Sequence, residues 1–125
     1  MLRAVLAVRA AAMMLRAILA ITANGQESLA LRKTALAAIN ANYPKQFSRY
    51  SLPLLLLDST PSDLRQFIIQ TERFRRNENR LRGSKERDGR YRRDAFDEAV
   101  FKLRNTQDSS LAREALLYVK TLQLD

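Results

Sequence analysis

The fold is decided by residues 60–81, which read TPSDLRQFIIQTERFRRNENRL. Thr60 is a suitable helix cap, Pro61 suits the first helical position, and Asp63 places a negative charge in the first turn. The spacing that follows predicts one apolar stripe, formed by Leu64, Phe67, Ile68, Thr71 and Phe74. We therefore expect a helix that begins here and continues through arginine-rich sequence to Leu81.

The sequence on both sides of this segment also indicates helices. Asn24 is the expected N-cap of a helix that ends near Asn42, because the residue before Pro44 avoids the helical region. A further helix follows a charged break at 83–89, and its apolar residues are Tyr91, Phe96, Ala99, Val100 and Leu103. Asp108 is the expected N-cap of the last helix, whose apolar face is formed by Leu111, Ala115, Tyr118, Val119 and Leu122.

No stretch alternates between apolar and polar residues with a period of two, so the predicted fold class is all-α. We expect four to five amphipathic helices in an elongated small subunit. Residues 45–61 contain two more prolines and are expected to form an extended loop. Its Leu54–Leu57 run needs burial in this chain or in a partner. The thin core favours a subunit of a larger assembly.

The N-terminal segment, residues 1–24, carries Arg3, Arg9 and Arg16 but no acidic residue. An apolar, arginine-bearing and acid-free start is typical of a mitochondrial targeting segment. We expect an uncleaved targeting-like helix that is also part of the structure. The predicted organisation is this helix followed by a helical domain, residues 25–125, with an arginine-rich segment at 65–93.

The chain is strongly basic, with 22 Lys and Arg against 13 Asp and Glu, which gives a net charge of +9. Arginine forms planar, two-pronged contacts with phosphate and carboxylate groups. The arginine-rich segment is therefore expected to meet an acidic protein, an anionic lipid such as cardiolipin, or RNA. Some of its charges are spaced as i,i+4 pairs on a solvated helix face, namely Glu72–Arg76, Glu78–Arg82 and Glu86–Arg90.

The composition argues against an enzyme. The chain has no Cys and no His, so it lacks thiol nucleophiles, imidazole bases and Cys/His metal ligands. Its three glycines cannot build a phosphate-binding loop. The carboxylates of Asp94, Asp97 and Glu98 lie beside arginines and are interpreted as ordinary surface salt bridges.

Two short stretches carry a family resemblance. Residues Leu29-Ala30-Leu31-Arg32-Lys33, followed by Leu36 and Tyr43-Pro44, and later Phe74-Arg75-Arg76-Asn77, resemble the motifs of the LYR-motif family of small mitochondrial proteins across residues 29–104. The resemblance implies binding of acyl carrier protein. Arg32 and Lys33 would contact its acidic helix or phosphopantetheine, and Phe74 would lie near the acyl chain. The chain itself is expected to hold no cofactor and no metal.

Together these observations predict a non-catalytic accessory subunit of a large mitochondrial assembly, a respiratory-chain complex or ATP synthase, on the matrix side of the inner membrane. The alternative is a mitochondrial ribosomal protein that binds rRNA through Arg65–Arg93. The protein is not expected to be a free monomer. The predicted partner-binding residues are Arg32, Lys33, Arg73, Phe74, Arg75, Arg76, Arg80, Arg82, Arg92 and Arg93.

Overall fold

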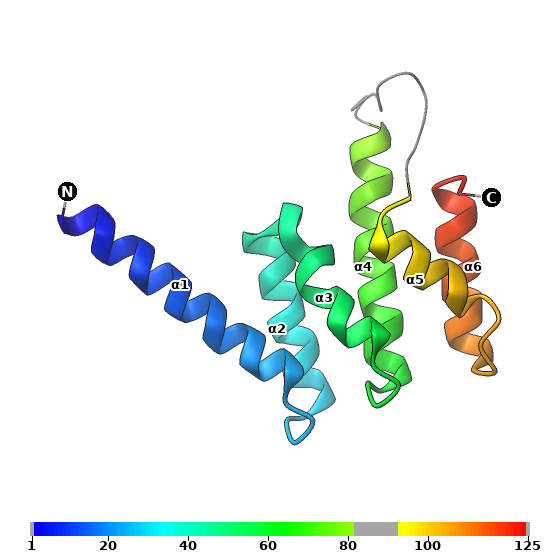
Figure 1. Ribbon diagram of the computed structural model, residues 1–125, viewed down its shortest axis with the longest axis horizontal. Coiled ribbons are helices and arrows are strands. Elements are labelled where there is room, and N and C mark those ends of the chain that lie inside the picture. The colour runs from blue at the N-terminus through cyan, green and yellow to red at the C-terminus, as the bar shows by residue number, and fades with distance from the viewer. Residues whose placement is uncertain (1, 82–92, 125) are drawn as a thin grey trace. The chain divides into compact units, whose positions relative to one another are not determined.

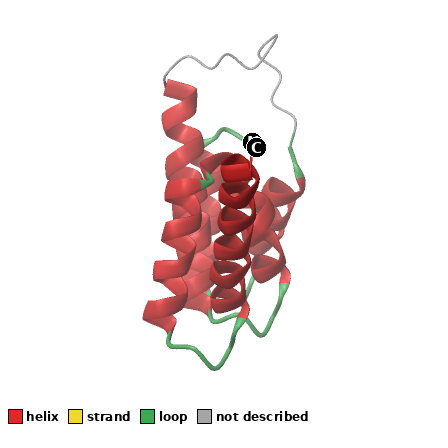
Figure 2. Ribbon diagram, turned by 90° about the vertical axis from the view of Figure 1, so that its left-hand side faces the viewer, coloured by secondary structure: helices red, strands yellow, loops and turns green. Residues whose placement is uncertain are grey.

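The computed structural model describes residues 2–81 and 93–124, with side chains from Met13 onward. About 79% of these described residues are helical, and no strand occurs among them, which confirms the all-α prediction (Figures 1 and 2). The six α-helices are one more than the upper end of the prediction. They are α1 (Leu2–Ala23), α2 (Leu29–Asn42), α3 (Phe47–Leu56), α4 (Ser62–Leu81), α5 (Ala95–Leu103) and α6 (Ser109–Thr121), with a 3-10 turn, η1 (Pro44–Gln46), before α3.

The chain divides into two compact units, Met1–Lys45 and Gln46–Asp125. In the first unit, α2 packs against α1 as a helical hairpin. The predicted cap of α2 is wrong. Asn24 Oδ1 accepts a hydrogen bond from the backbone N–H of Gln26 inside the connecting turn, and the N-cap is Ser28, whose Oγ accepts from the N–H of Leu31 at 3.1 Å.

The second unit is formed by α3 to α6. Helix α4 packs against α3 and α6, and α5 packs against α3 and α6. Helices α4 and α6 run in the same direction (Figure 1), and their first turns are joined by a hydrogen bond between the side chains of Ser62 and Asp108. The core of this unit is apolar. Its fully buried members include Phe47, Leu55, Leu64, Ile68, Ile69, Val100, Leu111, Ala115, Tyr118 and Val119.

The extended loop predicted over 45–61 is wrong, because α3 occupies most of it and contains Pro53 inside the helix. Proline removes one helical hydrogen bond, but this helix buries Phe47, Leu54 and Leu55. Apolar burial therefore outweighs the local preference. The leucine run is divided, since Leu54 and Leu55 are buried whereas Leu56 and Leu57 are exposed.

Helix α4 has the predicted extent but a rotated buried face. Leu64 and Ile68 are buried as predicted, and the other buried residues are Ile69 and Glu72. Phe67 and Thr71 are only half-buried, and Phe74 is 70% exposed, so the placement of Phe74 in the core stripe is wrong. Glu72 can be buried because Arg75 and Arg76 neutralise its carboxylate, and its burial places this side of α4 against the core.

The later helices follow their predicted patterns. Asp108 caps α6 by accepting from the N–H of Leu111 at 3.1 Å, and every predicted apolar residue of α6 is buried. This hydrogen bonding, first from Ser62 and then from the backbone, lowers the pKa of the Asp108 carboxyl. In α5, Phe96, Ala99 and Val100 are buried and Leu103 is half-buried. Tyr91 lies outside the described residues.

The rotated face of α4 is tested by two substitutions. Ile68→Ala is expected to lower the free energy of unfolding by about 3 kcal/mol, because it leaves a cavity in the core. Phe74→Ala, which removes the larger side chain, is expected to change it by less than about 0.5 kcal/mol because that side chain is exposed. Urea denaturation measures both. Equal losses would show that Phe74 belongs to the core after all.

Candidate partner-binding site

A set of charged and polar side chains joins α4, α5 and α6 inside the second unit. We call it the ionic cluster, and its members are Glu72, Arg75, Arg76, Asp94, Asp97 and Tyr118.

Arg76 is the centre of the ionic cluster. Its Nε donates to Glu72 Oε2 at 2.6 Å, its Nη1 to Asp97 Oδ1 at 2.9 Å and its Nη2 to Asp94 Oδ2 at 2.8 Å. Its Cζ lies 5.4 Å from the centroid of the Phe96 ring. Each nitrogen of the guanidinium therefore meets a different carboxylate, and an aromatic ring lies beside the group.

The two innermost carboxylates are fully buried and have several donors each. Glu72 is 0% exposed and also accepts two hydrogen bonds from Arg75, at 2.9 and 2.8 Å. Asp97 is 0% exposed and accepts from the Tyr118 hydroxyl at 2.6 Å. Buried carboxylates are tolerated only when their charge and hydrogen-bonding capacity are satisfied, and this arrangement satisfies both.

The start of α5 places the two aspartates. Asp94 is the N-cap, and its Oδ1 accepts from the N–H of Asp97 at 2.9 Å. In return, Asp97 Oδ2 accepts from the N–H of Asp94 at 3.1 Å, which completes a capping box. The same two carboxylates therefore begin α5 and bind Arg76, so the helix start and its contact with α4 form together.

Two groups of the cluster, Asp94 and Arg76, have pKa values shifted toward their charged forms. Burial raises the pKa of the Asp94 carboxyl, but hydrogen bonds and charge from Arg76 and a backbone hydrogen bond within the capping box outweigh it and hold that pKa below its usual value. Burial lowers the pKa of the Arg76 guanidinium, but Tyr118, Glu72, Asp94 and Asp97 outweigh that effect and raise it above its usual value. The ion pairs that cause these shifts therefore connect α4 to the start of α5.

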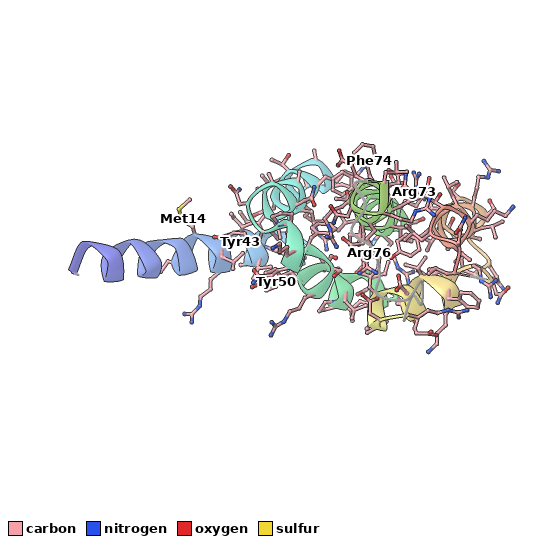
Figure 3. All side chains as sticks on the ribbon, turned by 90° about the horizontal axis from the view of Figure 1, so that it is seen from above. Met14, Tyr43, Tyr50, Arg73, Phe74 and Arg76 are labelled. Carbon is pink, nitrogen blue, oxygen red and sulfur yellow. The ribbon has the colours of Figure 1, made fainter. Side chains whose placement is uncertain are left out.

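The side of α4 opposite the ionic cluster carries an exposed aromatic residue. Figure 3 shows Phe74 and Arg76 leaving α4 on opposite sides, and the Phe74 side chain is 70% exposed. One turn earlier, Gln70 Nε2 donates to Glu114 Oε1 on α6 at 2.9 Å. Because the two helices run in the same direction, the next turn brings Phe74 and Leu117, which is 41% exposed, to the same level. We call Gln70, Phe74, Glu114 and Leu117 the outer seam.

Basic residues flank the outer seam. Arg73 is half-buried, and Figure 3 shows it on the side of α4 that faces α6. Its Nε is buried without a hydrogen-bond partner among the described residues. Arg80 is exposed and donates to Asn77 Oδ1 at 3.2 Å, and Arg113 and Lys120 are exposed on α6 on either side of Leu117. Two acidic residues also belong here, namely Glu114 in the seam and the exposed Glu78 one turn after Phe74. This surface therefore has an apolar centre and an edge on which basic residues outnumber acidic ones.

The structure gives several of the predicted binding residues partners within the chain. Arg32 is buried, and its Nε donates to the carbonyl oxygen of Thr22 at 3.0 Å in the first unit, where Lys33 is half-buried. Arg75 and Arg76 belong to the ionic cluster. Of the ten predicted residues, Phe74 and Arg73 lie at the outer seam, and Arg80 is exposed near the end of the same helix. Arg82 and Arg92 lie outside the described residues.

Arg93 precedes α5. Its Nη2 donates to the carbonyl oxygen of Leu124 at 2.6 Å, and its Nη1 lies 3.8 Å from Glu98 Oε1. The Arg93–Glu98 pair is partly exposed, in agreement with the interpretation of Glu98 as a surface ion-pair residue.

Two predictions about ion pairs are wrong. The Glu72–Arg76 pair forms, but Glu72 is buried instead of lying on a solvated face. Asp97 is also buried and is no ordinary surface salt bridge. Two sequence signals were available: Glu72 follows Ile68 by four residues on the buried stripe, and Asp94 and Asp97 have capping-box spacing. The pairs Glu78–Arg82 and Glu86–Arg90 include residues outside the described ranges.

Neither a metal site nor a membrane span is found in the part of the chain that the structure describes. No group of three or more acidic residues there is arranged to hold a metal ion. No helix there combines the length and apolar character that crossing a bilayer requires.

Comparison with known proteins gave no significant match to a family model, to a curated protein or to a solved structure.

The ionic cluster is tested by removing its centre. Arg76→Met is expected to lower the free energy of unfolding by about 3–5 kcal/mol, because Glu72 and Asp97 lose a buried counter-charge. Arg80→Met removes the same charge from an exposed position and is expected to cost less than about 1 kcal/mol. Urea denaturation at neutral pH separates the two. Similar small losses would mean that the cluster adds no stability.

The lowered pKa of Asp94 predicts a pH dependence. A carboxyl whose pKa is lower in the folded protein stabilises the fold above its unfolded pKa of 3.8, and this stability is lost as pH falls through the folded value. Asp94→Asn keeps a good N-cap residue but removes the charge. The stability difference between the wild type and this variant is expected to be largest near neutral pH and to shrink below about pH 4. Urea denaturation at several pH values measures it, and a constant difference would contradict the assignment.

Proposed function

We propose that the protein is a non-catalytic accessory subunit of a large mitochondrial assembly, a respiratory-chain complex or ATP synthase, on the matrix side of the inner membrane. It docks on a neighbouring subunit through the outer seam. The observation that carries this proposal is the 70% exposure of Phe74 on a helix whose other side is fully packed and ionically satisfied.

The apolar part of the outer seam supports a protein partner. Phe74 and Leu117 lie at one level, and Leu81, seven residues after Phe74 on α4, is also exposed. Burying apolar surface gains roughly 25 cal/mol per Å², so covering these side chains favours association. Grouped large apolar side chains on a small domain are typical of interaction sites.

The basic edge indicates the charge of that partner. The nearby turns of α4 and α6 carry four basic residues, Arg73, Arg80, Arg113 and Lys120, and two acidic ones, Glu78 and Glu114, so the basic charge is in excess. A neighbour with acidic residues around an apolar contact would complement this surface. Acyl carrier protein, which the family resemblance implies, has such an acidic surface. The exposure of Phe74 supports this role, whereas the burial of Arg32, which donates to the carbonyl oxygen of Thr22, argues against the contact expected of that residue.

The mitochondrial part of the proposal rests on the N-terminal segment. Helix α1 carries Arg3, Arg9 and Arg16 without an acidic residue, as mitochondrial targeting helices do. Met13 and Met14 on α1 are both exposed and offer a further apolar contact. An uncleaved targeting helix of this kind would serve as a structural part of the assembly.

The ribosomal alternative has less support from the described contacts. Five described arginines of the Arg65–Arg93 segment donate hydrogen bonds within the chain. Arg65 and Arg93 donate to backbone carbonyl oxygens, Arg75 and Arg76 donate to carboxylates, and Arg80 donates to Asn77. Phosphate binding requires arginines with free donors. The segment therefore offers RNA fewer free arginines than its composition suggests.

Docking through the outer seam is tested by Phe74→Asp. This variant is expected to fold, because the residue is exposed, but to be absent from the assembly, since a partner cannot bury the new charge. Leu116→Asp is the matched control, because it makes the same kind of change at an exposed position of α6 that is not part of the outer seam. Native electrophoresis of detergent-solubilised mitochondria, with import measured in parallel, is expected to show the control in the assembly and the Phe74 variant outside it.

Three outcomes would contradict the proposal. Normal incorporation of Phe74→Asp would show that the outer seam is not the docking surface. Co-sedimentation of the wild type with ribosomal subunits, and its release by nuclease or high salt, would favour the rRNA alternative. Recovery of the wild type as a stable free monomer would exclude both.

A further inference from the structure

Phe101 on α5 lies between two guanidinium groups. The Cζ of Arg104 is 3.4 Å from the centroid of its ring, and the Cζ of Arg93 is 4.2 Å from the same point. Two guanidinium groups cannot fit together on one face of the ring at these distances without overlapping. They therefore cover opposite faces, as their positions before and after α5 allow.

Each guanidinium is anchored and keeps free donors. Arg93 donates one bond to the carbonyl oxygen of Leu124, and Arg104 donates its Nε to the carbonyl oxygen of Phe101 at 3.0 Å. A guanidinium has five N–H donors, so most donors are not used by these bonds. Among the described residues no hydrogen bond uses the Nη groups of Arg104. The carboxylate near Arg93, that of Glu98, is 3.8 Å away and half-exposed.

Two positive charges held around one ring repel each other. The ring quadrupole attracts each of them. Among the described residues, the one carboxylate paired with either guanidinium is that of Glu98, which at 3.8 Å compensates only part of the charge. A bound anion would offset the remainder. The fixed planar donors of arginine match the oxygen atoms of a phosphate, so phosphate is the anion that this pair suits best.

We propose that Arg93 and Arg104, held by Phe101, bind the headgroup phosphates of an anionic phospholipid of the cardiolipin type. The inference rests on the proposed location at the inner membrane. A headgroup with two phosphates offers one to each guanidinium. Single-stranded RNA is less suitable, because both faces of Phe101 are already covered and the ring cannot stack on a base.

The test uses the full-length protein and phosphatidylcholine vesicles with or without cardiolipin. Flotation is expected to show binding only when cardiolipin is present. Arg104→Gln is expected to weaken this binding by about fivefold or more. Arg49→Gln removes one charge from an exposed position on α3 and is expected to change it less than about twofold. Thermal unfolding followed by circular dichroism checks that both variants fold.

A second variant tests the role of the ring. Phe101→Leu keeps an apolar side chain but removes the aromatic faces that hold the two guanidiniums. It is expected to weaken cardiolipin binding although both arginines are still present. Unchanged binding would overturn the part of the inference that assigns a positioning role to Phe101.

Other results overturn the site as a whole. Equal losses for Arg104→Gln and Arg49→Gln would show general charge attraction to the membrane. Absence of cardiolipin-dependent binding would exclude the lipid, and binding of a single-stranded RNA oligonucleotide that depends on Arg104 would assign the pair to RNA. Incorporation of Arg104→Gln into the assembly separates the two proposals, because the outer seam is unchanged in this variant.

Discussion

Neutralisation of the buried Arg76 guanidinium is the constraint on which the second unit depends. Its three nitrogens bind a carboxylate from α4 and two from the start of α5, and Tyr118 of α6 donates to one of these. A buried charge without these partners would cost several kcal/mol. The ionic cluster therefore fixes the rotation of α4 and the start of α5 at the same time, and it ties both helices to α6.

The rotation of α4 determines which of its side chains lie at the surface. Turning Glu72 and Arg76 inward turns Phe74 outward, because these side chains leave the helix on opposite sides (Figure 3). The same rotation determines which arginines are paired with carboxylates inside the chain and which lie at the surface. Those on the inner side are neutralised within the chain, whereas Arg80 and the basic residues of α6 stay at the surface. The net charge of +9 is therefore a poor guide to where a partner binds, and the position of each arginine is a better one.

Local signals in the sequence predicted much of the fold. The extent of α4, the Asp108 cap and the buried stripe of α6 depend on residues a few positions apart, and all three agree with the structure. The burial of Glu72 could not be predicted in this way, because its stability depends on Arg76 and on Asp94 and Asp97, about twenty residues later in the chain. Helix α3 was missed because Pro53 argues against a helix locally, whereas the burial of Phe47 and Leu55 favours it.

The central claim is that α4 has a satisfied inner side and an outer side reserved for a partner. Hydroxyl-radical footprinting of the isolated protein and of the protein in intact mitochondria tests it most directly, with mass spectrometry reporting oxidation at Phe74, Leu117 and the buried Tyr118. We predict strong oxidation of Phe74 and Leu117 in the isolated protein, their protection in mitochondria, and protection of Tyr118 in both. Protection of Phe74 in the isolated protein, or its full oxidation in mitochondria, would contradict the account.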